Sequence, residues 1–228
     1  MSSHIISTVA VPQPLHIRPE FTYPDSNWCR PEVSRAGCST GQYSKNALIY
    51  AQGERSDSVF VILGGWVKLC AVSPQGRQAV VAVMGAGSIL GEYCLLDQPY
   101  QTASATAIEK STIFRIQKHD LRQRLLREAP FADSFMRRLL EQKERTERAL
   151  LTQLFHSSEK RLASTLLYLA PSGSDRIPRM NQETLAAMVG TTRSRISYFM
   201  NKLKRDGLVR YDNGIRLDRR RLTELLEE

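Results

Sequence analysis

The hydrophobic periodicity changes near residue 118, and this change limits the possible folds more than any other feature of the chain. Between Cys38 and Gln117, short apolar runs alternate with turns rich in Gly. Strands separated by such turns at intervals of about 8–12 residues predict an antiparallel sandwich or roll. No part of this region resembles a βαβ unit. The expected strands are 48–50, 58–63, 66–72, 79–84 and 111–116.

Beyond residue 118 the apolar spacing is helical. Leu121, Leu125 and Leu126 predict a short helix that ends near Pro130. Residues 131–155 contain neither Gly nor Pro, so they predict one long helix. Two interpretations remain open: the helix lies across its own domain, or it pairs with a second copy as a coiled coil. Its length and apolar ends favour the dimer. The expected interface residues are Phe135, Leu139, Gln142, Thr146, Leu150 and Leu154.

The strongest functional pattern follows in the C-terminal third. Asn181 is a good N-cap for a first helix, and Gly190 suits the turn after it. Thr191 or Thr192 then caps a second helix, whose apolar residues recur at intervals of three and four. This arrangement predicts a helix-turn-helix. The apolar residues of the second helix are Ile196, Phe199, Met200 and Leu203.

The opposite face of the second helix is polar and basic. Arg side chains can chelate guanine in the major groove, and hydroxyls near a helix N-terminus can bind phosphates. A solvated basic face without a ligand is the alternative for this helix alone. A hairpin predicted at 208–217, with Asn213-Gly214 as a two-residue turn, makes the unit a winged helix and favours DNA. The expected DNA-binding residues are Gln182, Thr191, Thr192, Arg193, Ser194, Arg195, Ser197, Tyr198, Asn201, Lys202 and Lys204.

The charge distribution points to a polyanionic partner for the same region. The chain has a net charge of +9, and residues 157–228 hold 14 basic and 9 acidic side chains. Residues 1–120 hold 10 basic and 9 acidic side chains, so the positive charge is concentrated in the C-terminal third. A basic surface that only aids solubility is the competing explanation.

Other classes of protein fit the composition poorly. No apolar run approaches the roughly 18 residues of a membrane helix, and the N-terminus lacks signal-peptide features, so a cytoplasmic protein is expected. The Cys and His residues are scattered without metal-binding spacing, so no metal or required cofactor is expected. A jelly-roll oxygenase would need several His ligands, and the roll region has only His119, at its edge. We therefore expect no enzymatic activity.

The order of roll, long helix and winged helix resembles the catabolite activator/FNR superfamily of bacterial transcription regulators over residues 38–228. Residues 91–97, Gly-Glu-Tyr-Cys-Leu-Leu-Asp, are similar to the opening of that family's phosphate-binding cassette, and residues 182–203 are similar to its reading module. The resemblance implies a symmetric homodimer on a palindromic operator and a roll that senses a small effector. It places the effector pocket at Gly91, Glu92, Tyr93, Cys94, Leu95, Gln101, Thr102 and Ala103.

Two departures from the family pattern concern specificity. Cyclic-nucleotide-binding members carry an Arg where this chain has Gln101, and a neutral amide cannot form a charged pair with a phosphate. The effector is therefore expected to differ from cyclic AMP. A frequent acidic reader falls at Ser194 and a frequent basic reader at Tyr198, so the operator should differ as well. A ligand-independent regulator with a vestigial pocket is the alternative.

The predicted fold class is α+β, with an N-terminal antiparallel β-roll like a cyclic-nucleotide-binding jelly roll, a long dimerisation helix and a C-terminal winged helix-turn-helix. The expected partners are double-stranded DNA, a second copy of the chain and RNA polymerase, with no membrane. The predicted divisions are an extended or partly disordered N-terminal arm (1–34), an effector-sensing roll (35–128), the dimerisation helix (129–156) and the winged-helix DNA-binding domain (157–228).

Overall fold

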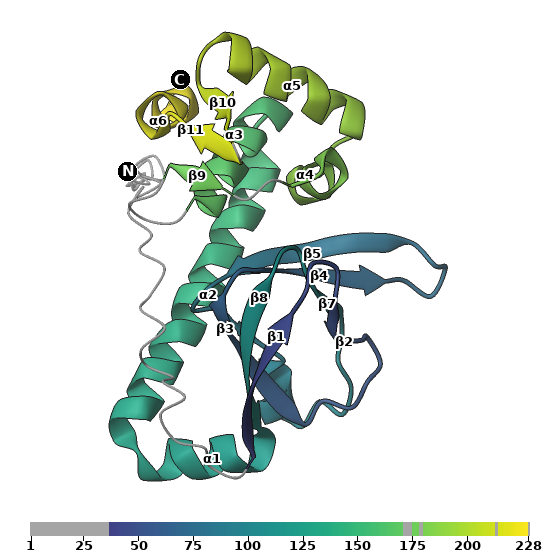
Figure 1. The fold of residues 1–228 in the computed structure, drawn as a ribbon, viewed down its shortest axis with the longest axis vertical. Coiled ribbons are helices and arrows are strands. Elements are labelled where there is room, and N and C mark those ends of the chain that lie inside the picture. The colour runs from purple at the N-terminus through teal and green to yellow at the C-terminus, as the bar shows by residue number, and fades with distance from the viewer. Residues whose placement is uncertain (1–36, 171–174, 178–179, 213, 228) are drawn as a thin grey trace, which may run out of the picture.

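The computed structural model describes residues 37–170, 175–177, 180–212 and 214–227. The predicted N-terminal arm, residues 1–34, lies outside these ranges. Figure 1 shows a β-roll beside one long helix, with a smaller helical unit next to the C-terminal end of that helix. This is the α+β architecture predicted from the sequence.

The roll consists of two four-stranded antiparallel sheets. The strand order is β1-β8-β3-β6 in one sheet and β2-β7-β4-β5 in the other. The five strands expected from apolar runs are present as β2, β3, β4, β5 and β8, whereas β1, β6 and β7 lie outside the predicted runs. The strands span Cys38–Tyr43 (β1), Leu48–Tyr50 (β2), Ser58–Gly64 (β3), Trp66–Val72 (β4), Gln78–Gly85 (β5), Ile89–Leu90 (β6), Ser104–Ala107 (β7) and Ser111–Gln117 (β8).

The strand β3 is buried on both faces. Phe60 and Ile62 belong to the core between the two sheets. Val59 and Val61 point to the other face of the strand, because successive side chains alternate. They pack in a second core with apolar residues from the first two helices, Leu121, Phe131 and Phe135.

Two helices connect the roll to the C-terminal unit. α1 (Lys118–Arg127) follows β8 directly, and α2 (Ala129–Phe155) starts after a single intervening residue. Pro130 lies in the first turn of α2, where a missing backbone N–H costs nothing. Ser157 then caps α3 (Ser158–Leu169), because its side chain accepts a hydrogen bond from the Lys160 amide at 3.4 Å.

The C-terminal unit is a winged helix. Its sheet has the order β10-β11-β9, and β9 lies outside the predicted hairpin. Tyr211 pairs with Ile215, so the turn contains three positions and not the predicted two. The Asp212 amide donates to the Gly214 carbonyl at 3.2 Å, and Asn213 lies outside the described residues. The elements are β9 (Arg176–Ile177), α4 (Gln182–Val189), α5 (Arg193–Arg205), β10 (Val209–Tyr211), β11 (Ile215–Leu217) and α6 (Arg219–Glu227).

The winged helix and the roll share a hydrophobic contact. Trp66 of β4 and Val83 of β5 are buried in the same cluster as Leu185 and Val189 of α4. Figure 1 shows α4 between the roll and α5. The position of the helix-turn-helix is therefore defined relative to the roll as well as to α2 and α3.

Candidate functional site

The helix-turn-helix is formed by α4 and α5, and both helices begin at residues predicted as caps. Asn181 Oδ1 accepts a hydrogen bond from the Thr184 amide at 2.7 Å. Thr192 Oγ1 accepts one from the Arg195 amide at 3.3 Å, so Thr192 is the cap of α5. Gly190 ends α4 with φ 66°, in the left-handed region where the absence of a Cβ matters.

α5 buries one face and exposes the other. Ile196, Met200 and Leu203 are at most 2% exposed and form the buried face. Most of the predicted DNA-binding residues lie on the other side of the helix or at its N-terminal end. The exposed ones are Thr192, Arg193, Ser194, Arg195, Tyr198, Asn201 and Lys204, and the half-buried ones are Gln182, Thr191, Ser197 and Lys202.

Two basic side chains of α5 have acidic partners in the winged helix. Arg193 lies 3.5 Å from Glu183, and both side chains are exposed. An exposed pair of this kind is weak, so Arg193 can exchange Glu183 for a base or a phosphate. Lys202 Nζ lies 2.8 Å from Glu159 Oε1 of α3, and this hydrogen bond raises the pKa of Lys202. The Lys202 side chain is 41% exposed, so this pair too is accessible to solvent.

The wing adds two basic residues that the sequence analysis missed. Arg210 and Arg216 are direct partners in the β10–β11 register, and both are exposed. Asp212 Oδ2 lies 3.7 Å from Arg216 and 3.0 Å from Arg176. The signal that could have identified them is the position of each Arg next to a buried apolar residue, Val209 in β10 and Ile215 and Leu217 in β11.

Arg161 of α3, which the sequence analysis also missed, joins the helix-turn-helix to the end of α2. Its Nε donates to the Val189 carbonyl at 2.9 Å, and its Nη2 donates to the Gly190 carbonyl at 3.1 Å. Its Nη1 is 3.4 Å from the carbonyls of Gln153 and His156. One guanidinium thus satisfies carbonyls at the C-terminal ends of both α4 and α2, where intrahelical donors are missing.

The predicted cassette is a tight turn that leads into the 3₁₀ helix η2 (Glu92–Leu96). Gly91 starts the turn with φ 72°. A Cβ at this position would lie only 2.8 Å from the Ser58 carbonyl oxygen and 3.3 Å from Gln101 Nε2. The turn therefore requires Gly, both for its conformation and for space.

The far end of η2 is attached to α1 by ion pairs. Asp97 Oδ1 lies 2.6 Å from Lys118 Nζ and 3.0 Å from Arg122 Nη2. The hydrogen bond from Lys118 and the neighbouring positive charges hold the pKa of Asp97 below its usual value. These contacts connect the cassette to the helix that precedes α2.

The predicted effector residues differ in exposure. Burial raises the pKa of the Cys94 thiol to about 11, so this thiol stays protonated at neutral pH. Burial also raises the pKa of the Glu92 carboxyl, and burial together with the Glu92 charge raises the pKa of Tyr50. A desolvated carboxyl is a feature of functional sites. Gly91, Cys94 and Gln101 are buried, Glu92, Leu95 and Ala103 are half-buried, and Tyr93 and Thr102 are exposed.

Gln101 occupies the position at which the family pattern has an Arg. It is only 7% exposed. Its backbone N–H donates to the Glu54 backbone carbonyl at 2.8 Å, and its backbone carbonyl accepts from the Gly53 backbone N–H at 2.9 Å. Because its side-chain amide lies beside Gly91, a neutral group fills the space next to the cassette turn.

The predicted interface residues of α2 are divided between two faces. Phe135 is buried in the roll core, and Leu139 packs against the same core. Gln142 Nε2 donates to the Ile89 carbonyl at 3.0 Å, and its Oε1 accepts from the Ile89 amide at 3.1 Å. These three residues therefore face the roll of the same chain, because the roll uses the inner face of the helix. Thr146, Leu150 and Leu154 remain exposed, together with Met136, Leu140 and Phe155.

The described part of the chain shows neither a cluster of metal ligands nor a membrane-spanning helix. No three His, Cys, Asp or Glu side chains there are grouped so that they could hold a metal ion. No helix there is long and apolar enough to cross a membrane.

Two family models match the chain. Residues 40–128 match the cyclic nucleotide-binding domain, and residues 160–225 match the Crp-like helix-turn-helix domain. The two matches together span more than half of the chain. They correspond to the roll with α1 and to the winged helix.

Curated relatives are similar over most of their length. The cyclic AMP receptor protein of Thermus thermophilus is 28% identical over 173 residues, which cover 75% of this chain and 80% of the relative. A CRP-like cAMP-activated global transcriptional regulator of Mycobacterium tuberculosis is 25% identical over 177 residues, covering 75% and 79%. The chain thus spans about four fifths of the length of each of these relatives.

Solved structures share the fold. FixK2 from Bradyrhizobium japonicum has a TM-score of 0.71 at 19% identity, covering 82% of this chain and 96% of that one. A CRP-family transcriptional regulator from Thermus thermophilus has a TM-score of 0.68 at 19% identity, covering 82% and 97%. Together with the two matched domains, these similarities place the chain in the CRP/FNR family of bacterial transcription regulators, which bind DNA through the helix-turn-helix.

Proposed function

We propose that the chain acts as a homodimer that binds a palindromic operator through α5 and regulates transcription together with RNA polymerase. The observation that carries this proposal is the exposed N-terminal half of α5, where Arg193, Ser194, Arg195 and Tyr198 are open to solvent. Recognition helices contact base edges with their N-terminal residues. Two such helices in a symmetric dimer would bind half-sites about 34 Å apart.

We expect Arg193→Ala to weaken operator binding by about 1–3 kcal/mol and to relax the base preference at one position. The reason is that an exposed guanidinium can form two hydrogen bonds to guanine. Lys204→Ala should instead weaken binding to all sequences alike, because a lysine contacts the DNA phosphates and not the bases. The slope of log K against log salt concentration should fall in magnitude by about one. Lys202→Ala is expected to act in the same way, and Lys143→Ala is the matched control, because this exposed lysine lies on α2 and not on α5.

The measurement is fluorescence anisotropy, over a range of salt concentrations, with two DNA duplexes. One is an operator selected from a random library by the protein itself, and the other is a random duplex. Equal losses on both duplexes for Arg193→Ala would remove this residue from base reading. A complete absence of sequence preference in the unmodified protein would contradict the proposed function.

We further propose that the roll binds an effector at the cassette, and that this effector is not cyclic AMP. Glu92 is half-buried, and desolvation raises the pKa of its carboxyl. A ligand hydroxyl that donates a hydrogen bond to the carboxylate could offset the free-energy cost of this desolvation. Gln101 supplies an amide but no charge next to Gly91. The cassette thus has a group for a polar ligand and lacks the cation of the family pattern.

Cyclic AMP is expected to bind the unmodified protein no tighter than the millimolar range. Loss of a charged hydrogen bond to a buried anion costs about 2–5 kcal/mol, which moves a micromolar ligand toward millimolar affinity. Titration calorimetry with cyclic AMP and cyclic GMP measures this directly. Gln101→Arg should gain affinity, whereas Gln98→Arg, which adds the same charge at an exposed position of the same loop, should not. Micromolar binding by the unmodified protein would contradict the proposal.

The packing of Gln101 also supports a second candidate, a regulator whose roll binds no ligand. Its backbone is hydrogen-bonded on both sides, and its side chain already fills the space beside Gly91. Native mass spectrometry of the purified protein separates the candidates. A co-purified small molecule favours the effector-controlled form, and operator binding by ligand-free protein at full affinity favours the ligand-independent form.

A further inference from the structure

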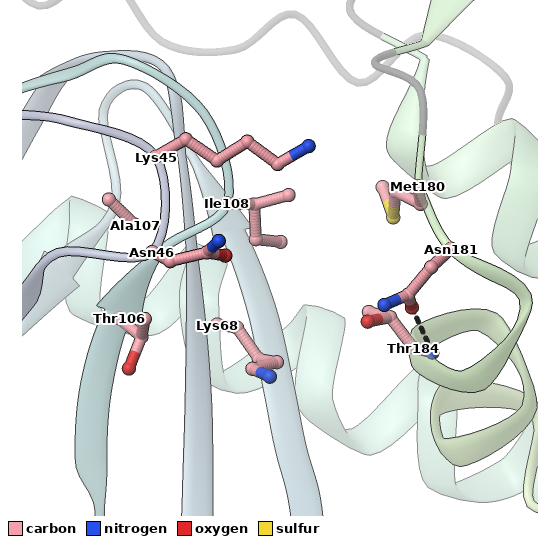
Figure 2. Close-up of a pocket in the computed structure, with 9 residues that line it drawn as sticks. All are labelled: Lys45, Asn46, Lys68, Thr106, Ala107, Ile108, Met180, Asn181 and Thr184. Atoms are coloured by element: carbon pink, nitrogen blue, oxygen red, sulfur yellow. Dashed lines mark hydrogen bonds between the residues drawn. The ribbon is translucent and has the colours of Figure 1, made fainter.

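A small cavity of about 90 Å³ lies between the roll and the winged helix. Figure 2 shows the two sides of this cavity, with the roll on one side and the start of α4 on the other. None of the nine residues that line it is acidic. Its polar lining residues are Lys45, Asn46, Lys68 and Thr106 from the roll, and Asn181 and Thr184 from the winged helix.

The winged-helix side presents hydrogen-bond donors to the cavity. Asn181 Oδ1 accepts the capping hydrogen bond from the Thr184 amide, so the side-chain amide of Asn181 is left to donate. Figure 2 shows this amide nitrogen and the Thr184 hydroxyl turned toward the roll. The cap that starts α4 therefore also orients a donor into the cavity.

The roll side contributes two positive charges. Lys45 and Lys68 have no ion-pair or hydrogen-bond partner for their side chains within the part of the chain that the structure describes. Figure 2 shows the two ammonium groups at different ends of the cavity, and both add positive potential that favours an anion inside it. Asn46, on the same side, adds an amide to these donors.

We propose that this cavity binds a small oxyanion, with inorganic phosphate as its representative, and that the bound anion ties the winged helix to the roll. The cavity has room for a few water molecules, which suits a tetrahedral oxyanion and is too small to enclose a nucleotide. A free anion fits better than a DNA phosphate, because α4 lies between the roll and the reading helix α5 (Figure 1). The cassette is a separate site, at Gly91 and η2.

The anion site would act on the arrangement of the two units. Lys68 belongs to the roll and Asn181 to the winged helix. An anion can therefore contact both residues only while α4 is packed against β5. A ligand that binds one arrangement better shifts the population toward it. Phosphate should therefore favour the packed arrangement without covering the exposed face of α5.

The test is titration calorimetry of the full-length protein with inorganic phosphate, at constant ionic strength and without DNA. We expect saturable binding with a Kd of about 1 mM or below. Lys45→Gln and Lys68→Gln should each weaken it about tenfold or more, because each removes a charged donor. Lys143→Gln is the matched control, since this exposed lysine lies on α2 and pairs with Glu147.

Two outcomes would overturn the proposal. One is phosphate binding that is absent, or that is unchanged in both cavity variants. The other concerns binding of the double variant, Lys45→Gln with Lys68→Gln, to a random DNA duplex. If the slope of log K against log salt concentration fell in magnitude by about two, both lysines would be assigned to the DNA backbone. Because phosphate binding is measured without DNA, failure of this proposal leaves the function proposed for α5 untouched.

Discussion

The double substitution Leu140→Glu and Leu150→Glu is expected to convert a dimer into a monomer. These leucines are 61% and 58% exposed on the outer face of α2, where Met136 and Leu154 extend the same apolar stripe. Burial of a leucine contributes about 1.5–3 kcal/mol, and a symmetric pair would bury four of them. The substitution should therefore weaken association by several orders of magnitude. Light scattering at micromolar concentration measures the change in mass.

DNA binding should fall with the dimer. A monomer has one reading helix, so it loses the gain of about a hundredfold or more that a second, linked half-site provides. Leu126→Glu is the matched control, because this leucine is 83% exposed but lies on α1. An unchanged mass for the double variant would place the interface elsewhere on the chain, and a monomeric unmodified protein would remove the dimer from the proposed function.

Arg161→Ala is expected to lower the free energy of unfolding by about 3 kcal/mol, which corresponds to roughly 6–12 °C in Tm for a chain of this size. The substitution removes the donors to Val189 and Gly190, at the turn between α4 and α5, and to carbonyls at the end of α2. The hydrogen bond from Gln153 Nε2 to the Met188 carbonyl, at 3.3 Å, then remains between the end of α4 and the long helix. Operator affinity should fall as well, because α5 is no longer held in one orientation.

Two variants make this result specific to the geometry of the guanidinium. Arg161→Lys keeps the charge but cannot bridge both helix ends, so most of the loss should remain. Lys160→Ala removes the adjacent cation, whose side chain makes no hydrogen bond in the described residues, and should change Tm little. Thermal unfolding by calorimetry gives the comparison. A wild-type Tm for Arg161→Ala would show that the attachment is not needed.

Local signals in the sequence were sufficient for the reading module. Asn181, Gly190 and Thr192 act within one turn of their own position, through caps and a left-handed backbone. The buried face of α5 follows directly from apolar spacing, since a helix places every third or fourth residue on one side. For this reason the helix-turn-helix and most of its exposed face could be predicted from the order of the amino acids alone.

Features that depend on distant partners could be decided only by the tertiary structure. β1 has the sequence Cys-Ser-Thr-Gly-Gln-Tyr, which shows no apolar alternation, and it is a strand because β8 pairs with it. The spacing of α2 favoured a seam with a second copy, but it is also compatible with contact to its own roll. The bond between Gln142 and Ile89, 53 residues apart, assigns the inner face to the roll. The pattern of a helix reports which residues share a face, but only the fold determines what that face contacts.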